Sequence, residues 1–177
     1  MSTGPHSDSK RQARRQWLLA AGAAAGGYAV LRFATSGTLV ANAAPAESFE
    51  VSHSDETWRT LLTPQQYAIL RQEGTERAFT SPLNEEKRRG VFACAGCSLD
   101  AFSSETKFES GTGWPSFWKP LPNAINQRSD RSLGMVRDEV HCRRCGGHFG
   151  HVFDDGPQPT GLRYCMNGLS LKFNPAS

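Results

Sequence analysis

Four of the five cysteines form two Cys-x-x-Cys motifs, and the fifth stands apart from them. The motifs are Cys94-Ala95-Gly96-Cys97 and Cys142-Arg143-Arg144-Cys145, with about 44 residues between them. Two residues between thiolates let both reach one ion, so the pair of motifs predicts a tetrahedral zinc site with Zn–S bonds of roughly 2.3 Å. Four thiolates complete the coordination and leave no open position for chemistry. Cys165 is then the one thiol free to react, and the pattern predicts a thiol enzyme stabilised by a structural metal.

Three other interpretations of the four cysteines stay open. The first is disulfides, if the protein is exported to an oxidising compartment. The second is a rubredoxin-like iron site, and the third is a zinc ribbon that binds nucleic acid. Structural zinc is the interpretation that we favour. A twin-arginine route exports folded proteins, so metal could be loaded in the reducing cytosol before export.

Residues 1–43 have the order of a secretory signal. A basic stretch at residues 10–15 precedes an apolar, Ala- and Gly-rich stretch at 17–31, and Ala41-Asn42-Ala43 gives a small-x-small cleavage pattern. The adjacent Arg14 and Arg15 resemble a twin-arginine signal, although Ala13, Trp17 and Leu19 depart from its commonest residues. We therefore expect export to a bacterial periplasm, cleavage near Ala43 and only transient contact with the membrane.

An uncleaved membrane anchor is the alternative for this segment. As a helix, residues 17–31 would span only about 22 Å at 1.5 Å per residue, against roughly 30 Å of hydrocarbon. The three glycines in the stretch also weaken its hydrophobicity. The length therefore favours a cleaved signal.

The basic charge of the chain belongs to this segment. The whole chain carries a net charge of +3, and residues 1–43 contain five basic residues against one acidic residue, which leaves a net charge of −1 for the remainder. A domain with that balance has no global positive field, so we expect no nucleic-acid partner.

The remaining chain predicts a linker at 44–53 and one mostly β domain at 54–177. Thr63, Pro64 and Gln66 form a helix start with a capping box, and this helix should end near Gly74. A short helical turn is expected at 84–88. Brief β-compatible runs follow, separated by Gly, Pro and Asp, at residues 90–93, 135–140 and 169–173.

Two histidines shortly precede Cys165. In a straight strand His148 and His151 would face opposite sides, but Gly150 between them permits a bulge that re-aims both into one pocket. Arg163, two residues before Cys165, favours a thiolate electrostatically. Together, these residues favour a reactive Cys165 over a buried, inert thiol.

Three stretches closely resemble the B-type peptide-methionine (R)-S-oxide reductases: residues 107–117, 142–157 and 163–167. The resemblance runs from about residue 58 to 173. It implies two coiled antiparallel sheets of the β-tent type, a few short N-terminal helices, and one structural Zn²⁺ on Cys94, Cys97, Cys142 and Cys145. It also implies reduction of the R sulfoxide of methionine, in oxidised proteins or peptides, with a thioredoxin-like or other thiol as reductant. We expect a monomer.

The resemblance also implies roles for individual residues. Cys165 is the nucleophile, with His148, His151 and Asn167 around the sulfoxide. The residues implied to bind the substrate are Trp114, which lies against its methyl group, Arg163 and Phe153.

Two positions depart from the pattern of this family. Thr112 stands where many members carry a resolving cysteine, so oxidised Cys165 should be regenerated by an external thiol. Gly168 replaces a common serine and removes a hydroxyl near the site. Two rival functions remain: a zinc-stabilised binding module in which Cys165 is inert, and a thiol peroxidase, which also passes through a sulfenic acid.

Overall fold

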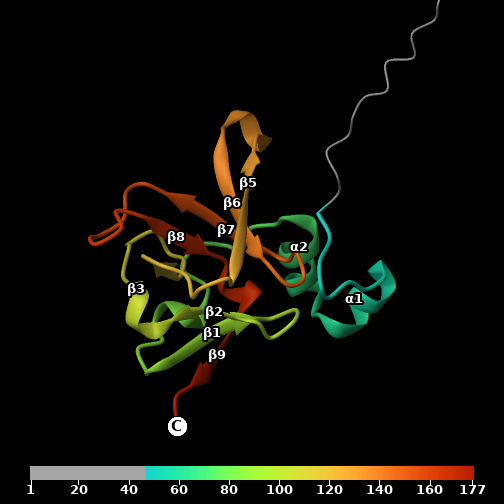
Figure 1. Ribbon diagram of the computed structural model, residues 1–177, viewed down its shortest axis with the longest axis horizontal. Helices are drawn as coiled ribbons and strands as arrows, with labels where there is room; N and C mark the ends of the chain where they lie inside the picture. Colours follow the sequence, from blue (N-terminus) through green and yellow to red (C-terminus); the bar gives the residue numbers. More distant parts are fainter. Residues whose placement is uncertain (1–46) are drawn as a thin grey trace, which may run out of the picture. The chain divides into compact units, whose positions relative to one another are not determined.

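Two antiparallel β-sheets make up most of the structure, a computed structural model that describes residues 47–177, the side chain of Leu133 excepted. The smaller sheet has the strand order β2-β1-β9 and the larger one β3-β4-β8-β7-β6-β5 (Figure 1). The smaller sheet comprises β1 (Gly90–Cys94), β2 (Asp100–Ser103) and β9 (Leu171–Pro175). The larger sheet comprises β3 (Lys107–Phe108), β4 (Ser116–Phe117), β5 (Ile125–Asp130), β6 (Arg137–Cys142), β7 (His148–Phe153) and β8 (Arg163–Met166). The predicted mostly β fold with two antiparallel sheets is confirmed.

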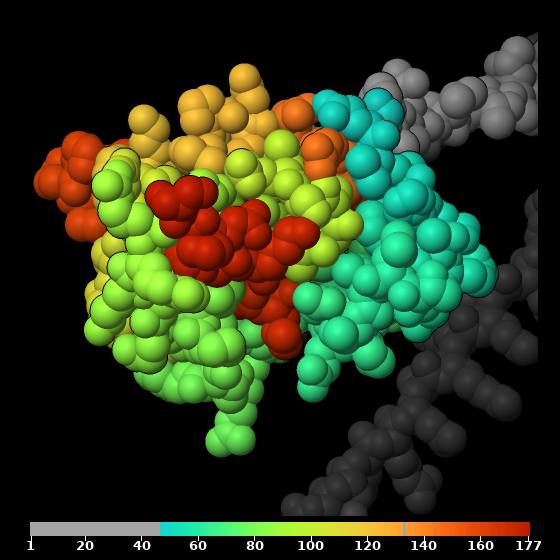
Figure 2. Space-filling model, turned by 90° about the horizontal axis from the view of Figure 1, so that it is seen from below, coloured from blue at the N-terminus to red at the C-terminus, as the bar shows by residue number. Residues whose placement is uncertain are grey.

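Aromatic side chains from both sheets form the core. Phe92 on β1 and Phe102 on β2 are fully buried, as are Phe117 on β4 and Phe149 on β7. The ring centroids of Phe102 and Phe117 lie 4.5 Å apart in a stacked arrangement, and those of Phe92 and Phe117 lie 5.0 Å apart. Such rings bury large apolar areas, so this cluster holds the two sheets together. Figure 2 shows the C-terminal segment (red) between residues near β1 (green) and the N-terminal helices (cyan to green).

Two short helices precede the sheets. Helix α2 (Pro64–Gln72) confirms the predicted helix: Thr63 and Gln66 form the capping box, and the helix ends at Glu73 in a left-handed conformation. Helix α1 (Asp55–Leu61), which the sequence analysis did not predict, begins at Ser54, whose side chain accepts a hydrogen bond from the Thr57 N–H. Its Trp58 is buried, so α1 adds an apolar contact to the core.

Single 3₁₀ turns account for the differences from the predicted boundaries. The helical turn predicted at 84–88 was wrong in position, because Ser81 caps a turn at η1 (Pro82–Asn84). The turn η4 (Gly168–Ser170) occupies the start of the strand predicted at 169–173, and the turn η3 (Ser132–Gly134) directly precedes the strand predicted at 135–140. Strands β9 and β6 therefore each begin two residues later than predicted. The remaining turn, η2 (Ser104–Thr106), joins β2 to β3.

The predicted signal at 1–43 lies outside the described residues. Of the predicted linker, residues 47–53 form no helix or strand, but the Val51 N–H donates to the carbonyl of Arg144 at 2.9 Å and Phe49 lies edge-on to His141. Within residues 47–177, no helix has the length and apolar character needed to cross a membrane.

Candidate active site and metal centre

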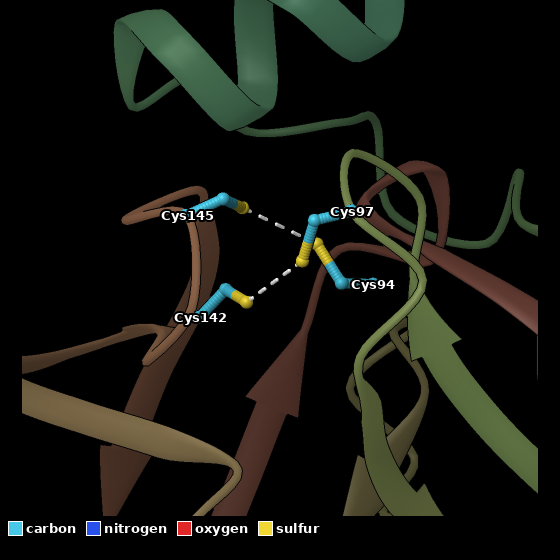
Figure 3. A group of neighbouring side chains, drawn as sticks. All are labelled: Cys94, Cys97, Cys142 and Cys145. Carbon is cyan, nitrogen blue, oxygen red and sulfur yellow. Dashed lines mark hydrogen bonds between the residues drawn. The ribbon is translucent and has the colours of Figure 1, made fainter. Parts of the chain in front are cut away.

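The four cysteines of the two motifs come together at one end of the two sheets (Figure 3). All five cysteines lie within the described residues and are free thiols. The sulfur atoms of Cys94 and Cys145 are 3.7 Å apart, and those of Cys97 and Cys142 are 3.5 Å apart. A tetrahedron with metal–sulfur bonds of roughly 2.3 Å has edges of about 3.8 Å, whereas a disulfide requires about 2.05 Å. The spacing therefore fits a four-coordinate metal ion rather than disulfides.

Both motifs are shaped by the same backbone turn. The N–H of Ser98 donates to the carbonyl of Cys94 at 2.9 Å, and the N–H of Gly146 donates to the carbonyl of Cys142 at 2.8 Å. Ser98 and Gly146 hold equivalent positions with φ of 63° and 68°. One turn follows β1 and the other follows β6, so an ion held by the four thiolates would link the two sheets.

Cys165 lies on β8, the strand between β4 and β7, in the larger sheet. Its partner across the ladder is His151 on β7, and on the other side Ser116 on β4. A cavity of about 110 Å³ adjoins it, lined by Trp114, Phe153, His151 and Asn167 among others. The structure therefore brings five of the predicted site residues to one cavity.

Burial raises the pKa of Cys165 above its ordinary value. A contact to the Thr112 hydroxyl at 3.8 Å opposes this effect, as does the positive charge of Arg163. The Thr112 hydroxyl is itself hydrogen-bonded to the Ser110 hydroxyl, with 2.8 Å between the oxygens. Burial outweighs these contacts, so the environment favours the thiol form of Cys165 over the thiolate.

The predicted bulge in β7 is present at Phe149. Val140 pairs with Gly150, but the adjacent His141 pairs with His148, so Phe149 is the extra residue. The ring centroids of His148 and His151 consequently lie 5.4 Å apart. Gly150 is required at this point, because a Cβ there would lie 2.1 Å from the carbonyl oxygen of Cys165.

His151 forms a hydrogen bond from Nε2 to Asp130 Oδ2 at 2.8 Å. Asp130 also accepts from Arg137 at 2.7 Å. The backbone N–H of Ser132, then its hydroxyl and His151, hold the pKa of Asp130 well below its ordinary value. Burial lowers the pKa of His151, and the bond to Asp130 opposes that effect. Asp130 therefore fixes the ring and favours its protonated form.

His148 is more deeply buried than His151 and does not line the cavity next to Cys165. Its Nδ1 bonds to Glu139 Oε1 at 2.7 Å, and Arg128 donates to the other oxygen of Glu139. Burial raises the pKa of Glu139, but the bonds from His148 and Arg128 outweigh it and hold the pKa below its ordinary value. His148 thus supports the site from behind, while His151 faces the cavity.

Glu76 organises two of the predicted site residues through its backbone. Its N–H donates to Asn167 Oδ1 at 2.9 Å, and its carbonyl accepts from Trp114 Nε1 at 3.1 Å. The Asn167 amide also donates to the carbonyl of Phe149 at 3.0 Å. The sequence analysis missed Glu76, Glu139, Asp130 and Arg137. Only Glu139, an acidic residue inside a predicted strand, gave any local signal.

Asp155 and Phe153 hold the side chain of Arg163, which is therefore not free to turn to the thiol of Cys165. Its guanidinium makes two 2.8 Å bonds to Asp155 and lies 4.3 Å from the ring centroid of Phe153. It therefore fixes Phe153 at the wall of the cavity and only partly offsets the effect of burial on Cys165.

The hydroxyl absent at Gly168 is replaced from elsewhere in the chain. A Cβ at position 168 would lie 1.8 Å from the Ser81 hydroxyl oxygen, which fills that space. The Gly168 N–H donates to Glu76 at 2.5 Å. The departure at position 168 is therefore accommodated by Ser81.

Comparison with known proteins agrees with this geometry. Residues 62–175 match the SelR domain family. Three relatives are each named peptide methionine sulfoxide reductase MsrB. The one from Leptospira interrogans is 55% identical, covering 71% of this chain and 97% of the relative. The one from Agrobacterium fabrum is 53% identical (71% and 94%), and the one from Methanosarcina mazei is 52% identical (70% and 89%). The chain therefore belongs to the MsrB family, a family of oxidoreductases with the SelR domain.

Proposed function

We propose that this protein reduces the R epimer of methionine sulfoxide in oxidised proteins and peptides to methionine. The observation that carries the proposal is the placement of Cys165 in a small cavity beside His151, Trp114 and Asn167. With dithiothreitol as reductant, R-sulfoxide in a peptide should be turned over and S-sulfoxide should not. Turnover of the S epimer, or of hydrogen peroxide in preference to both epimers, would contradict the proposal.

The cavity suits the end of one side chain. Its volume of about 110 Å³ is below the roughly 300–1,000 Å³ of usual small-molecule pockets. Trp114 and Phe153 supply apolar walls for the methyl group, and Arg163 holds Phe153 in place. The Asn167 amide has a second hydrogen beyond the one given to Phe149, available to the sulfoxide oxygen.

The proton that the sulfoxide oxygen must receive comes from the thiol of Cys165. His151, as general acid and base, takes the Cys165 proton and donates it to the sulfoxide oxygen as the thiolate attacks sulfur. The attack forms an S–S bond in an adduct. The protonated oxygen then passes from the substrate sulfur to the Cys165 sulfur as the S–O and S–S bonds of the adduct break, so methionine leaves and Cys165 becomes a sulfenic acid. The substrate sulfur gains the two electrons that the cysteine sulfur loses.

Asp130 is the positioning residue for this proton transfer, and Asp130→Asn tests it. The active form needs a thiolate with a protonated His151, and losing the Asp130 charge makes that form rarer. We expect kcat/KM to fall about tenfold, a part of the roughly 10²–10⁴-fold that general acid–base catalysis contributes. The acid limb of the pH profile should move to lower pH while the alkaline limb, which reports Cys165, stays in place. Asp100→Asn, an exposed substitution on β2 of the smaller sheet, is the control. Equal loss at every pH would contradict the assignment.

Regeneration of Cys165 requires an external thiol. Thr112 lies next to Cys165, in the place of a resolving cysteine, and the other four thiols form the metal cluster. A reductant thiol attacks the sulfenic acid and releases water, and a second thiol then resolves the mixed disulfide.

One turnover without reductant should leave a sulfenic acid on Cys165 that dimedone traps. Mass spectrometry should show one adduct per chain and no intramolecular disulfide. In Thr112→Cys the adduct should disappear in favour of a disulfide between positions 112 and 165, because these side chains are already in contact at 3.8 Å. A wild-type disulfide between Cys165 and any cluster cysteine, with release of metal, would refute the external-thiol step.

Two further proposals concern the metal and the location. The four-thiolate set supports Zn²⁺ as the ion, in a structural and closed site; elemental analysis of the purified protein tests it against iron.

The twin-arginine pattern supports export to the periplasm, with cleavage near Ala43, and we expect the exported protein to be a monomer. The intact mass of the exported protein tests cleavage, and an uncleaved mass would favour the membrane anchor.

A further inference from the structure

A second, larger cavity adjoins the one that contains Cys165. It measures about 410 Å³, and Arg137 and Phe153 line both cavities. The other residues that line it are Gln127, Val136, Asp138, Val152, Asp154 and Leu162. Its size falls in the range of roughly 300–1,000 Å³ that is usual for ligand sites. It is therefore a groove that continues the catalytic cavity, referred to below as the flanking groove.

The flanking groove lies beside the β5–β6 hairpin, which projects from the rest of the fold (Figure 1). Its lining comes from β5, β6, the end of β7 and the segment before β8. Val136 on the hairpin is 74% exposed, although it is apolar. Val152 and Leu162, which are half-buried, line the groove with Val136, and an apolar wall of this kind is typical of a surface that binds a ligand.

Arg137 provides an independent indication of a ligand. Its Nη2 donates to Asp130 and Ser132, but its Nε is buried and has no hydrogen-bond partner. Buried donors without an acceptor are rare in proteins. This donor belongs to a side chain at the boundary between the two cavities, where a bound peptide carbonyl oxygen would be its acceptor.

We propose that the flanking groove binds the polypeptide on one side of the oxidised methionine, an inference that rests on the proposed function. With the sulfoxide side chain in the small cavity, the adjacent residues of an extended chain leave it at about 3.3 Å per residue and reach the groove directly. Apolar residues next to the methionine contact Val136, Val152 and Leu162. Asp138 and Asp154 at the rim are both exposed and disfavour acidic flanking residues.

The test compares two substrates that present the same sulfoxide. One is an acetylated, amidated pentapeptide Lys-Leu-Met(O)-Leu-Lys, and the other is N-acetyl-methionine-sulfoxide amide, which has no flanking residues. Dithiothreitol is the reductant throughout. Val136→Asp places a charge in the groove, whereas Met135→Asp places the same charge on its neighbour, which is 51% exposed and does not line the groove.

The wild type should prefer the pentapeptide, and Val136→Asp should lower kcat/KM for it by about tenfold, or ~1.4 kcal/mol. The short substrate should change less than about twofold, as should both substrates with Met135→Asp. The inference is overturned if the two variants affect the pentapeptide equally. It is also overturned if Val136→Asp affects both substrates equally. Absence of turnover with either substrate in the wild type would instead refute the proposed function.

Discussion

Cys165→Ser should abolish sulfoxide reduction while leaving the metal content and the fold unchanged. We expect turnover to fall at least about 10³-fold, because the serine hydroxyl cannot accept the sulfoxide oxygen as a thiolate does and a removed nucleophile is not replaced. The fold should be retained because Cys165 is outside the core cluster and the metal cluster. The melting temperature should therefore change by less than about 5 °C.

Three measurements separate this outcome from its alternatives. Steady-state turnover of the R-sulfoxide peptide reports the nucleophile, elemental analysis reports the metal, and iodoacetamide labelling of the native protein reports the reactive thiol. Wild type should take up one label and the variant none. Retention of more than a trace of turnover would remove Cys165 from its assigned role. A wild-type protein that takes up no dimedone after exposure to the sulfoxide without reductant would favour a binding module.

The sequence predicted the parts of the fold that depend on short-range interactions. The capping box of α2 joins Thr63 to Gln66, three residues away, and was read directly. The bulge beside Gly150 was predicted for the same reason. Helix α1 was missed because only Trp58 marks its buried face. Strand starts were misplaced where 3₁₀ turns precede them, since such turns have no strong periodicity.

The residues that organise the site were not predictable in this way. Glu76 meets Asn167 across 91 residues of sequence, and Glu139 meets Arg128 only through the register of β5 and β6. These contacts exist because two sheets and α2 close on one another. A single sequence shows the reactive thiol and the histidines as motifs, whereas their supports are ordinary charged residues until the fold brings them together.

Replacing Cys97 or Cys142 with serine should lose both the metal and the folded state. Cys97 follows β1 of the smaller sheet, and Cys142 ends β6 of the larger one. Each substitution therefore breaks the same cross-link from opposite sides. A structural zinc site contributes roughly 10–16 kcal/mol of apparent binding free energy, against a net stability of about 5–15 kcal/mol for a domain. Without the ion, the turns that carry the thiols keep hydrogen bonds such as those from Arg71 to the carbonyl of Cys145 and from Arg144 to the carbonyl of Cys97, but the thiolate bridge between the sheets is lost.

Circular dichroism and elemental analysis of both variants test this prediction, with Cys165→Ser as the control that removes a thiol outside the cluster. Chelation of the wild-type metal under reducing conditions should give the same unfolded spectrum, and adding back Zn²⁺ should restore it. The two Cys-x-x-Cys motifs should behave alike, because the ion needs all four thiolates to close its coordination. If either variant remained folded and free of metal, the aromatic core formed by Phe92, Phe102 and Phe117 would suffice to hold the sheets together, and the metal would not be the element that completes the fold.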